Sequence, residues 1–140
     1  MNLTITLAVA DLERTEDFYR NLLQQPIERL SPGKGLPDLL LLMFDGSDVL
    51  FCQDQNLAAA NPALFQNLNR HPKGVGVALE LTYADLGPIS QKLDRQQRHL
   101  LYELQDDEHR RREFWLHDPD GYLLILTQEQ APAERKDDIA

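Results

Sequence analysis

Apolar and polar residues alternate in short runs that predict strands, and runs at helical spacing between them predict helices. Residues 3–9 (LTITLAV) alternate and are rich in β-branched types, which is typical of a strand. Residues 12–25 place Leu12, Phe18 and Leu22 on one face of a helix that Asp11 can cap. Turns and loops rich in Gly, Pro and Asp then separate further strands, expected at 26–30, 39–44 and 49–53.

The same order of elements begins again in the second half of the chain. Asp11 recurs as Asp85 at an offset of 74 residues, and Gly46 recurs as Gly121 at an offset of 75. The sequence therefore predicts an α+β fold of two βαβββ repeats, forming a curved mixed sheet with a concave ligand cup. The expected elements of the second repeat are a strand at 74–82, a helix at 85–97, and strands at 99–104, 112–117 and 122–128.

The length of 140 residues fits one domain that contains both repeats. The segment between the repeats is expected to be a linker with one short helix, and the polar C-terminus a flexible tail. The predicted boundaries are 1–130 for the domain, about 1–55 and 74–130 for its modules, 56–73 for the linker with its helix at 62–69, and 131–140 for the tail.

The composition of the chain indicates which kinds of ligand and which cellular location are expected. The chain has 14 basic and 23 acidic residues, a net charge of −9, which disfavours nucleic acid and favours cationic ligands. No apolar run reaches the roughly 18–20 residues of a membrane helix, and the N-terminus lacks a signal-peptide pattern, so we expect a cytoplasmic protein without membrane contact. Cys52 is the single cysteine, which excludes an internal disulfide and a cysteine-based zinc cluster.

Two segments carry a family resemblance. TLAVADLERTEDFYRNLL and REFWLHDPDGYLLILTQ resemble the first strand and helix and the final hairpin of the vicinal-oxygen-chelate superfamily. That superfamily includes glyoxalase I, extradiol dioxygenases, fosfomycin-resistance enzymes and bleomycin-resistance proteins, and the resemblance spans residues 3–128. It implies the fold but not one chemistry, because this fold hosts several.

The resemblance also implies where a metal would bind. Metal-dependent members hold a divalent ion with His and Glu side chains on equivalent strands of the two repeats. None of the four matching positions offers an imidazole or a carboxylate, so we expect the metal-free branch, with no metal and no cofactor. These positions are Thr4, Leu50, Ala78 and Ile125.

The cup should be lined by alternate residues of its strands. Glu80 shares a face with Ala78, and either Phe114 or Trp115 should face the cup while the other faces the helix layer. An aromatic residue there could carry a flat ligand, although core packing is an alternative. The predicted ligand-binding residues are Thr4, Thr6, Leu50, Cys52, Ala78, Glu80, Trp115, Leu123 and Ile125.

Three residues are candidates for acid–base chemistry: Glu80, Glu113 and His117. Each also has a structural reading, as a solvated carboxylate, a member of a local pair or a surface histidine. Cys52 is expected to behave as a small buried hydrophobe without a base in reach.

Three functions remain open on the sequence. The first is a metal-free protein that sequesters a flat or cationic small molecule, similar to bleomycin-resistance proteins. The second is a lyase or isomerase of the same superfamily that uses a carboxylate or histidine. The third is a non-catalytic dimeric interaction module. A homodimer is expected in all three, because sheet edges need cover.

Overall fold

The computed structural model describes residues 1–128, so the predicted tail at 131–140 lies outside the described residues. The chain divides into two compact units, which are described separately. The N-terminal unit comprises Met1–Val75 together with Pro119–Gly121, and the C-terminal unit comprises Gly76–Asp118 and, among the described residues, 122–128. Within residues 1–128, no helix has the length and apolar character needed to cross a membrane.

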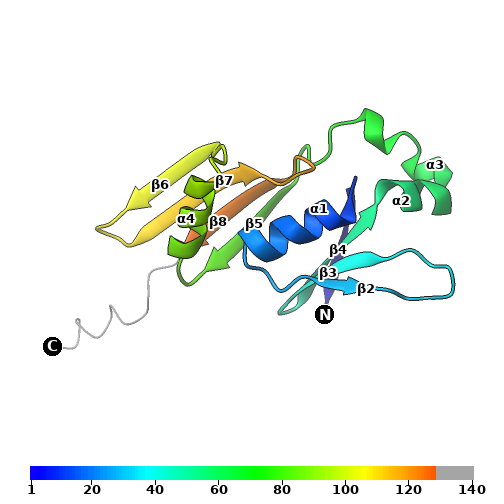
Figure 1. The fold of residues 1–140 in the computed structure, drawn as a ribbon, viewed down its shortest axis with the longest axis horizontal. Coiled ribbons are helices and arrows are strands. Elements are labelled where there is room, and N and C mark those ends of the chain that lie inside the picture. The colour runs from blue at the N-terminus through cyan, green and yellow to red at the C-terminus, as the bar shows by residue number, and fades with distance from the viewer. Residues whose placement is uncertain (129–140) are drawn as a thin grey trace. The chain divides into compact units, whose positions relative to one another are not determined.

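The N-terminal unit is a four-stranded sheet with the strand order β1-β4-β3-β2 (Figure 1). β1 and β4 run parallel, and the other neighbours are antiparallel. Its elements are β1 (Leu3–Val9), α1 (Leu12–Asp17) continuing as a π-helical turn (Phe18–Leu22), β2 (Glu28–Leu30), β3 (Leu39–Phe44), β4 (Ser47–Gln53), α2 (Asp54–Ala60), α3 (Pro62–Phe65) and a 3₁₀ turn (Leu68–Arg70).

The C-terminal unit repeats this topology with the order β5-β8-β7-β6, again with its first and last strands parallel. The class and repeat predicted from the sequence are therefore confirmed: the fold is α+β, and each repeat has the order βαβββ. The elements are β5 (Ala78–Tyr83), α4 (Gly87–Arg95), β6 (Tyr102–Asp106), β7 (Arg111–His117) and β8 (Leu123–Gln128).

The strand register repeats as well. Thr6 pairs with Leu50 between β1 and β4, and Glu80 pairs with Ile125 between β5 and β8. These two pairs are related by the same offsets that align the halves of the sequence. The sequence alignment of the repeats therefore also holds at the level of individual strand positions.

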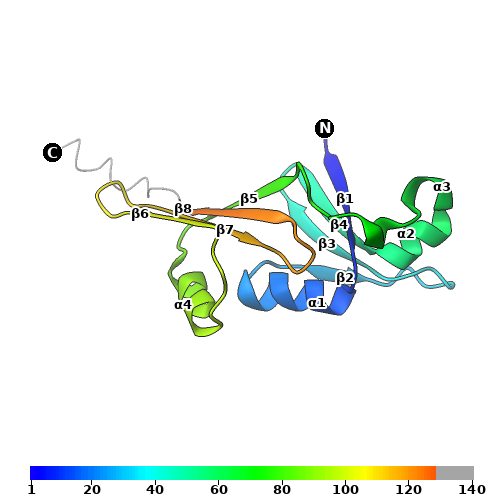
Figure 2. The same ribbon diagram turned by 90° about the horizontal axis from the view of Figure 1, so that it is seen from above.

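One helix covers one face of each sheet (Figure 2). Asp11 caps α1, because its Oδ1 accepts hydrogen bonds from the backbone N–H groups of Glu13 (2.9 Å) and Arg14 (3.4 Å). The ring of Tyr19 then packs 4.9 Å from that of Phe51 on β4. We call the sheet face turned away from α1 or α4 the distal face.

In the C-terminal unit, the side chains between sheet and helix form a closed apolar layer. Phe114, Leu116, Leu124 and Leu126 are buried together with Leu86, Ile89 and Leu93 of the helix segment. Arg112 lies on the same side, since its Nη2 donates to Ser90 Oγ of α4 at 3.2 Å and its guanidinium lies 5.2 Å from the centre of the Phe114 ring.

Most elements differ from their predicted bounds by one or two residues at an end, and larger differences occur in three places. β5 begins at Ala78 and not at residue 74, because residues 74–77 form turns around Gly74 and Gly76, both with positive φ. β6 covers Tyr102–Asp106 in place of 99–104, so Gln105 and Asp106, expected in a loop, are extended. The segment between the repeats holds α2 as well as helical turns in the region where one short helix is predicted.

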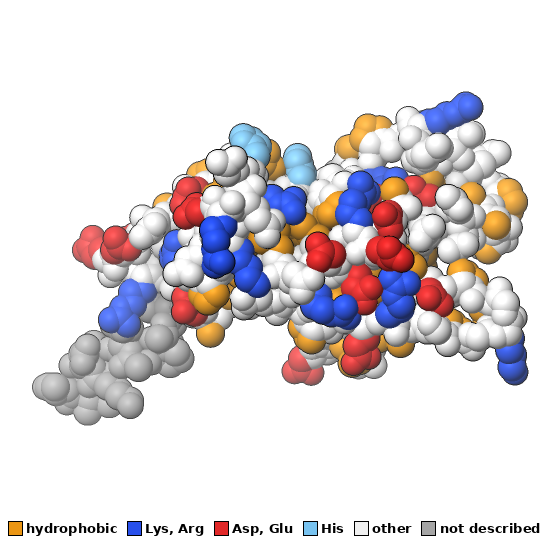
Figure 3. Space-filling view, viewed as in Figure 1, with side chains coloured by type: hydrophobic (Ala, Val, Ile, Leu, Met, Phe, Trp, Pro, Cys, Tyr) orange, Lys and Arg blue, Asp and Glu red, His pale blue; other side chains and the backbone are white. Residues whose placement is uncertain are grey.

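A pair of arginines ties α1 to β2 through Glu16. Glu16 contacts Arg20 at 2.8 Å and Arg29 at 3.0 Å, and the hydrogen bond from Arg29 lowers the pKa of the Glu16 carboxyl below its ordinary 4.5. Figure 3 shows basic and acidic side chains mixed over the surface of α1, so this face is not a block of one charge.

We expect Glu16→Gln to destabilise the protein by about 0.5–1 kcal/mol near neutral pH, because the pair is partly exposed. Glu16 has a lowered pKa in the folded state, so its contribution is complete above pH 4.5 and is lost as the pH falls through the folded-state pKa. Urea unfolding of wild type and variant, at neutral pH and in acid below the folded-state pKa of Glu16, measures this difference in stability. A difference that persists in acid would contradict the assignment.

Candidate functional site

The distal face of the C-terminal sheet carries a row of four side chains, one from each strand. Glu80 of β5 pairs with Ile125 of β8, Ile125 with Trp115 of β7, and Trp115 with Tyr102 of β6. Paired residues of neighbouring strands share a face. The row therefore runs from a carboxylate across an aliphatic residue to two aromatic rings.

The two aromatic rings contact one another, and a carboxylate fixes the indole. The ring centres of Tyr102 and Trp115 are 5.1 Å apart with a tilt of 57°. Trp115 Nε1–H donates to Glu113 Oε1 at 3.1 Å. Tyr102 is 45% exposed and Trp115 is half-buried, so both present accessible ring surface. We call the Tyr102–Trp115 pair, whose indole is fixed by the Glu113 carboxylate, the aromatic platform.

The rows on either side complete this face. Thr82 and Thr127 pair across β5 and β8 with their hydroxyl oxygens 3.3 Å apart, and Thr127 pairs in turn with Glu113. On the other side, Leu123 pairs with both Ala78 and His117. All three acid–base candidates, Glu80, Glu113 and His117, thus lie on the distal face of one sheet.

Glu80 and Glu113 differ in their freedom. Glu113 is half-buried and holds the indole, whereas Glu80 is exposed and its side chain makes no hydrogen bond or ion pair with residues 1–128. Of these two carboxylates, Glu80 is the one whose side chain has no partner among residues 1–128. Glu113 fixes the orientation of the Trp115 indole by accepting its N–H hydrogen bond.

The distal face of the N-terminal sheet holds the remaining predicted ligand-binding residues. The register pairs Thr6 with Leu50 and places Thr4 and Cys52 on the same side of β1 and β4. Both threonines are exposed, and Leu50 and Cys52 are half-buried. Of the nine predicted ligand-binding residues, four thus share this face and five share the distal face of the C-terminal sheet.

The thiol of Cys52 is free and half-buried. Burial raises its pKa above the ordinary 9.0, so little thiolate is present at neutral pH. We expect native protein to react with iodoacetamide at pH 7 several-fold more slowly than urea-unfolded protein, followed by intact-mass spectrometry. Equal rates in both states would show that the thiol is neither shielded nor shifted.

The donor set does not fit the metal that this fold implies. The four positions where the resemblance predicts the superfamily's ligands are held by Thr4, Leu50, Ala78 and Ile125, which lie on β1, β4, β5 and β8. A hydroxyl, a methyl group and two branched alkyl groups do not hold a hard or borderline cation. No catalytic step through a metal at these positions is supported.

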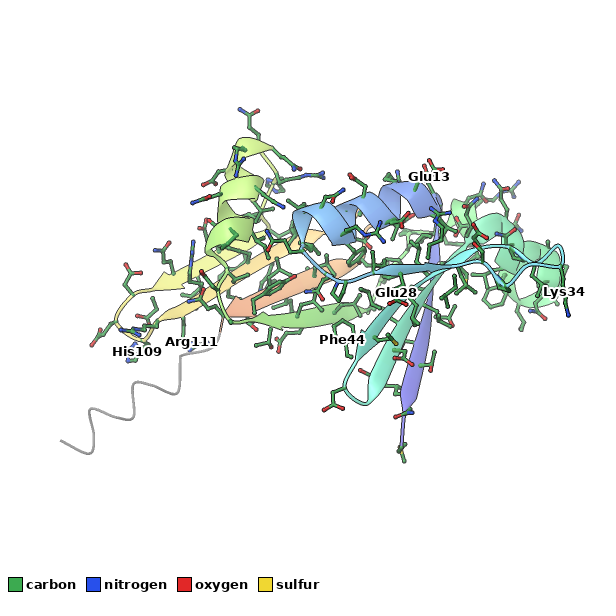
Figure 4. The ribbon with its side chains drawn as sticks, turned by 60° about the horizontal axis from the view of Figure 1, so that its bottom comes forward. Glu13, Glu28, Lys34, Phe44, His109 and Arg111 are labelled. Carbon is green, nitrogen blue, oxygen red and sulfur yellow. The ribbon has the colours of Figure 1, made fainter. Side chains whose placement is uncertain are left out.

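Among the described residues, Asp106, Glu108 and His109 form a group with ligand atoms within 4.8 Å of one another. It lies at the turn between β6 and β7, where Figure 4 shows His109 and Arg111. His109 Nδ1 is 2.8 Å from Asp106 Oδ2, and this hydrogen bond lowers the pKa of Asp106. These hydrogen bonds within the exposed turn explain why the three side chains lie close together, without a metal ion.

Sequence reasoning missed Tyr102 as a site residue. Its place opposite Trp115 depends on the β6–β7 register, which the shifted bounds of β6 determine. Strand alternation alone could not supply that register, because the apolar run at residues 99–104 favours an earlier strand. The signal would have been an aromatic pair in two consecutive predicted strands.

Comparisons with known proteins identify the fold. No family model and no curated protein matches the sequence. A solved glyoxalase/bleomycin resistance protein/dioxygenase from Nocardioides matches with a TM-score of 0.63 and 13% identity, covering 94% of this chain and 85% of that one. A member of the glyoxalase/bleomycin resistance protein/dioxygenase superfamily from Sphaerobacter thermophilus matches with a TM-score of 0.59 and 17% identity, covering 92% of this chain and 97% of that one.

A lactoylglutathione lyase from Agrobacterium tumefaciens is similar at a TM-score of 0.57, with 15% identity over 93% of this chain and 94% of that one. Similarity at this level of identity establishes the fold alone. The chain has the vicinal-oxygen-chelate fold, as the sequence resemblance predicts, and it spans nearly the full length of these structures.

Proposed function

Because the chain has the fold of the glyoxalase/bleomycin-resistance/dioxygenase superfamily, we propose that it is a metal-free small-molecule binding protein. The ligand would be flat and cationic and would lie on the distal face of the C-terminal sheet. The observation that carries this proposal is the Tyr102–Trp115 pair with Glu113 on the indole and Glu80 in the same row.

Chemistry favours a cation on this surface. An aromatic face attracts positive charge through its quadrupole, and the attraction is worth about 0.5–2 kcal/mol depending on exposure. Glu80 adds a formal negative charge across Ile125 from Trp115. The net charge of −9 works in the same direction at long range.

Binding without a metal is supported by the side chains at the superfamily's ligand positions. In this chain the Glu80–Ile125 row puts a branched alkyl group where a metal-binding carboxylate would be expected. The surface suits contact with an apolar ring better than chelation of an ion. Elemental analysis of purified protein would contradict this part of the proposal if it found stoichiometric metal.

Trp115 is the single tryptophan of the chain, so its fluorescence reports on the proposed site. We expect N-methylquinolinium to quench it saturably and quinoline, its neutral counterpart, to bind several-fold more weakly. Glu80→Gln should weaken binding of the cation by roughly fivefold, equivalent to about 1 kcal/mol. Calorimetry provides the second readout.

Glu103→Gln is the matched control for Glu80→Gln. Glu103 neighbours Tyr102 in β6 but pairs with Phe114, which is on the helix-covered face. Glu103→Gln therefore removes one negative charge from the same sheet, as Glu80→Gln does, but from its other face. If both variants weaken binding equally, only the net charge matters and the proposed site is wrong.

A second function, a lyase or isomerase, is favoured by Glu80 itself. An exposed carboxylate without a partner in residues 1–128 can accept a proton from a ligand on the same face. In a substrate screen that finds turnover, Glu80→Gln should lower kcat by roughly 10²–10⁴. Glu103→Gln should leave kcat unchanged, and a loss in both variants would dismiss Glu80 as the base.

We also propose a homodimer. Each sheet has two strands with only one neighbour in its own unit, β1 and β2 or β5 and β6, and natural proteins commonly cover such edge strands with another element or subunit. Light scattering coupled to size-exclusion chromatography would detect twice the 16.1 kDa mass of the chain. A monomer at high concentration would contradict it.

A further inference from the structure

We propose that the N-terminal unit has a second ligand site, in a pocket beside α2, and that it takes a neutral polyhydroxylated molecule about the size of a hexose. The pocket lies between α2 and residues 65–69 and has a volume of about 330 Å³. Figure 1 shows α2 and α3 next to one another in this part of the unit. All lining residues belong to the N-terminal unit, so this site is separate from the aromatic platform of the C-terminal sheet.

A carboxylate with one unused oxygen lies in the wall. Asp54 Oδ2 is 2.8 Å from Lys73 Nζ, and both side chains are largely buried, with 14% and 13% exposed. Asp54 Oδ1 is shielded from solvent and has no hydrogen-bond partner among the described residues. An unsatisfied buried acceptor of this kind is costly. A ligand hydroxyl that donated to Oδ1 would remove this cost and leave the ion pair of Oδ2 with Lys73 in place.

The charge of the wall selects a neutral ligand. Asp54 is the formally charged side chain in the lining, and Lys73 already neutralises it. A cationic ligand would have to compete with the lysine ammonium group, and an anionic one would meet the carboxylate. A hydroxyl group gains a hydrogen bond to Oδ1 without either cost.

The rest of the lining suits several hydroxyls on an apolar frame. Gln55, Asn67 and Asn69 bring carboxamides, each of which can donate and accept, while Phe65 and Ala58 supply apolar surface. Adjacent hydroxyls of a sugar or cyclitol present donors and acceptors with a carbon face behind them. The volume lies at the lower end of the range for small-molecule sites, which matches one ring.

The test is NMR titration of the full chain with D-glucose, D-galactose and myo-inositol. We expect saturable shifts of the side-chain amides of Gln55, Asn67 and Asn69 at millimolar concentration. Glucosamine and glucuronate, the charged counterparts of glucose, should bind more weakly. The site is overturned if no neutral probe saturates these shifts, and its ligand class is overturned if either charged sugar binds more tightly than glucose.

Three variants locate the binding. Ala58→Leu fills the pocket, and Asn67→Gly removes one carboxamide at a position whose φ of 64° glycine adopts easily. Each should weaken binding roughly tenfold. Ala59→Leu is the control, because Ala59 is exposed on the same helix and does not line the pocket. Wild-type affinity in both Ala58→Leu and Asn67→Gly, or an equal loss in Ala59→Leu, would overturn the proposal.

Discussion

Replacing Phe114 by alanine is expected to lower the free energy of unfolding by about 3–5 kcal/mol. The side chain is 1% exposed and lies between the C-terminal sheet and α4, with the Arg112 guanidinium 5.2 Å from its ring centre. Its removal leaves a cavity that the surrounding leucines cannot fill, since packed interiors relax only partly. Urea unfolding followed by circular dichroism measures the loss.

Trp115→Ala is the matched control, since the neighbouring residue points to the other face of the same strand. Trp115 is half-buried on the distal face, so we expect a loss of about 1 kcal/mol, accompanied by loss of binding of the cationic probe. Phe114 and Trp115 thus separate stability from ligand binding. If Trp115→Ala were as destabilising as Phe114→Ala, the tryptophan would be a core residue and not a ligand platform.

The second large effect is expected at Asp120. Its side chain is 2% exposed, and its Oδ1 accepts from the backbone N–H of Ala10 at 2.9 Å and from Arg14 Nη2 at 3.4 Å. Asp120→Ala removes a charged acceptor from buried surroundings, which should cost about 2–3 kcal/mol. The measurement is the urea midpoint at constant m-value.

Asp94→Ala provides the comparison for Asp120. Asp94 is exposed on α4, so the same change of residue should alter stability by no more than about 0.5 kcal/mol. Similar losses in the two variants would mean that Asp120 contributes only surface charge. The DPDG turn would then be held by its backbone and by Asp118, whose Oδ1 accepts from the Tyr122 backbone N–H at 3.0 Å.

Much of the fold could be predicted because its elements follow simple patterns. β1 and β3 have their predicted bounds, since alternation or an unbroken apolar run is flanked by polar turns. α2 was not predicted: its sequence DQNLAAA has strong helix formers but no buried residue, so it lacks an amphipathic signal. The extended Gln105 and Asp106 follow from pairing with Arg112 and Arg111, which no local propensity encodes.

The sequence predicts which residues of the candidate site share a sheet face, but not which side chains contact one another. Alternation places Glu80 with Ala78 and Thr82, and the structure has all three exposed on β5. Alternation could not decide which of Phe114 and Trp115 would meet α4, because either aromatic residue could fill the core. Nor could it reveal the hydrogen bond from Trp115 to Glu113 or the pocket beside α2, since these depend on side-chain orientation and on the path of an irregular segment.

The parallel pairing of first and last strands has a consequence for how the protein is made. Leu3 of β1 pairs with Ser47 of β4, and Ala78 of β5 pairs with Leu123 of β8, so in each unit the opening strand is completed by the closing one. A chain emerging from the ribosome therefore carries β1 without its sheet partner until β4 has been synthesised. The β3–β4 and β7–β8 neighbours are antiparallel and close in sequence, so we expect these hairpins to form before the first strand joins them. Translation speed through each repeat thus sets how long an unpaired apolar strand remains exposed to other chains.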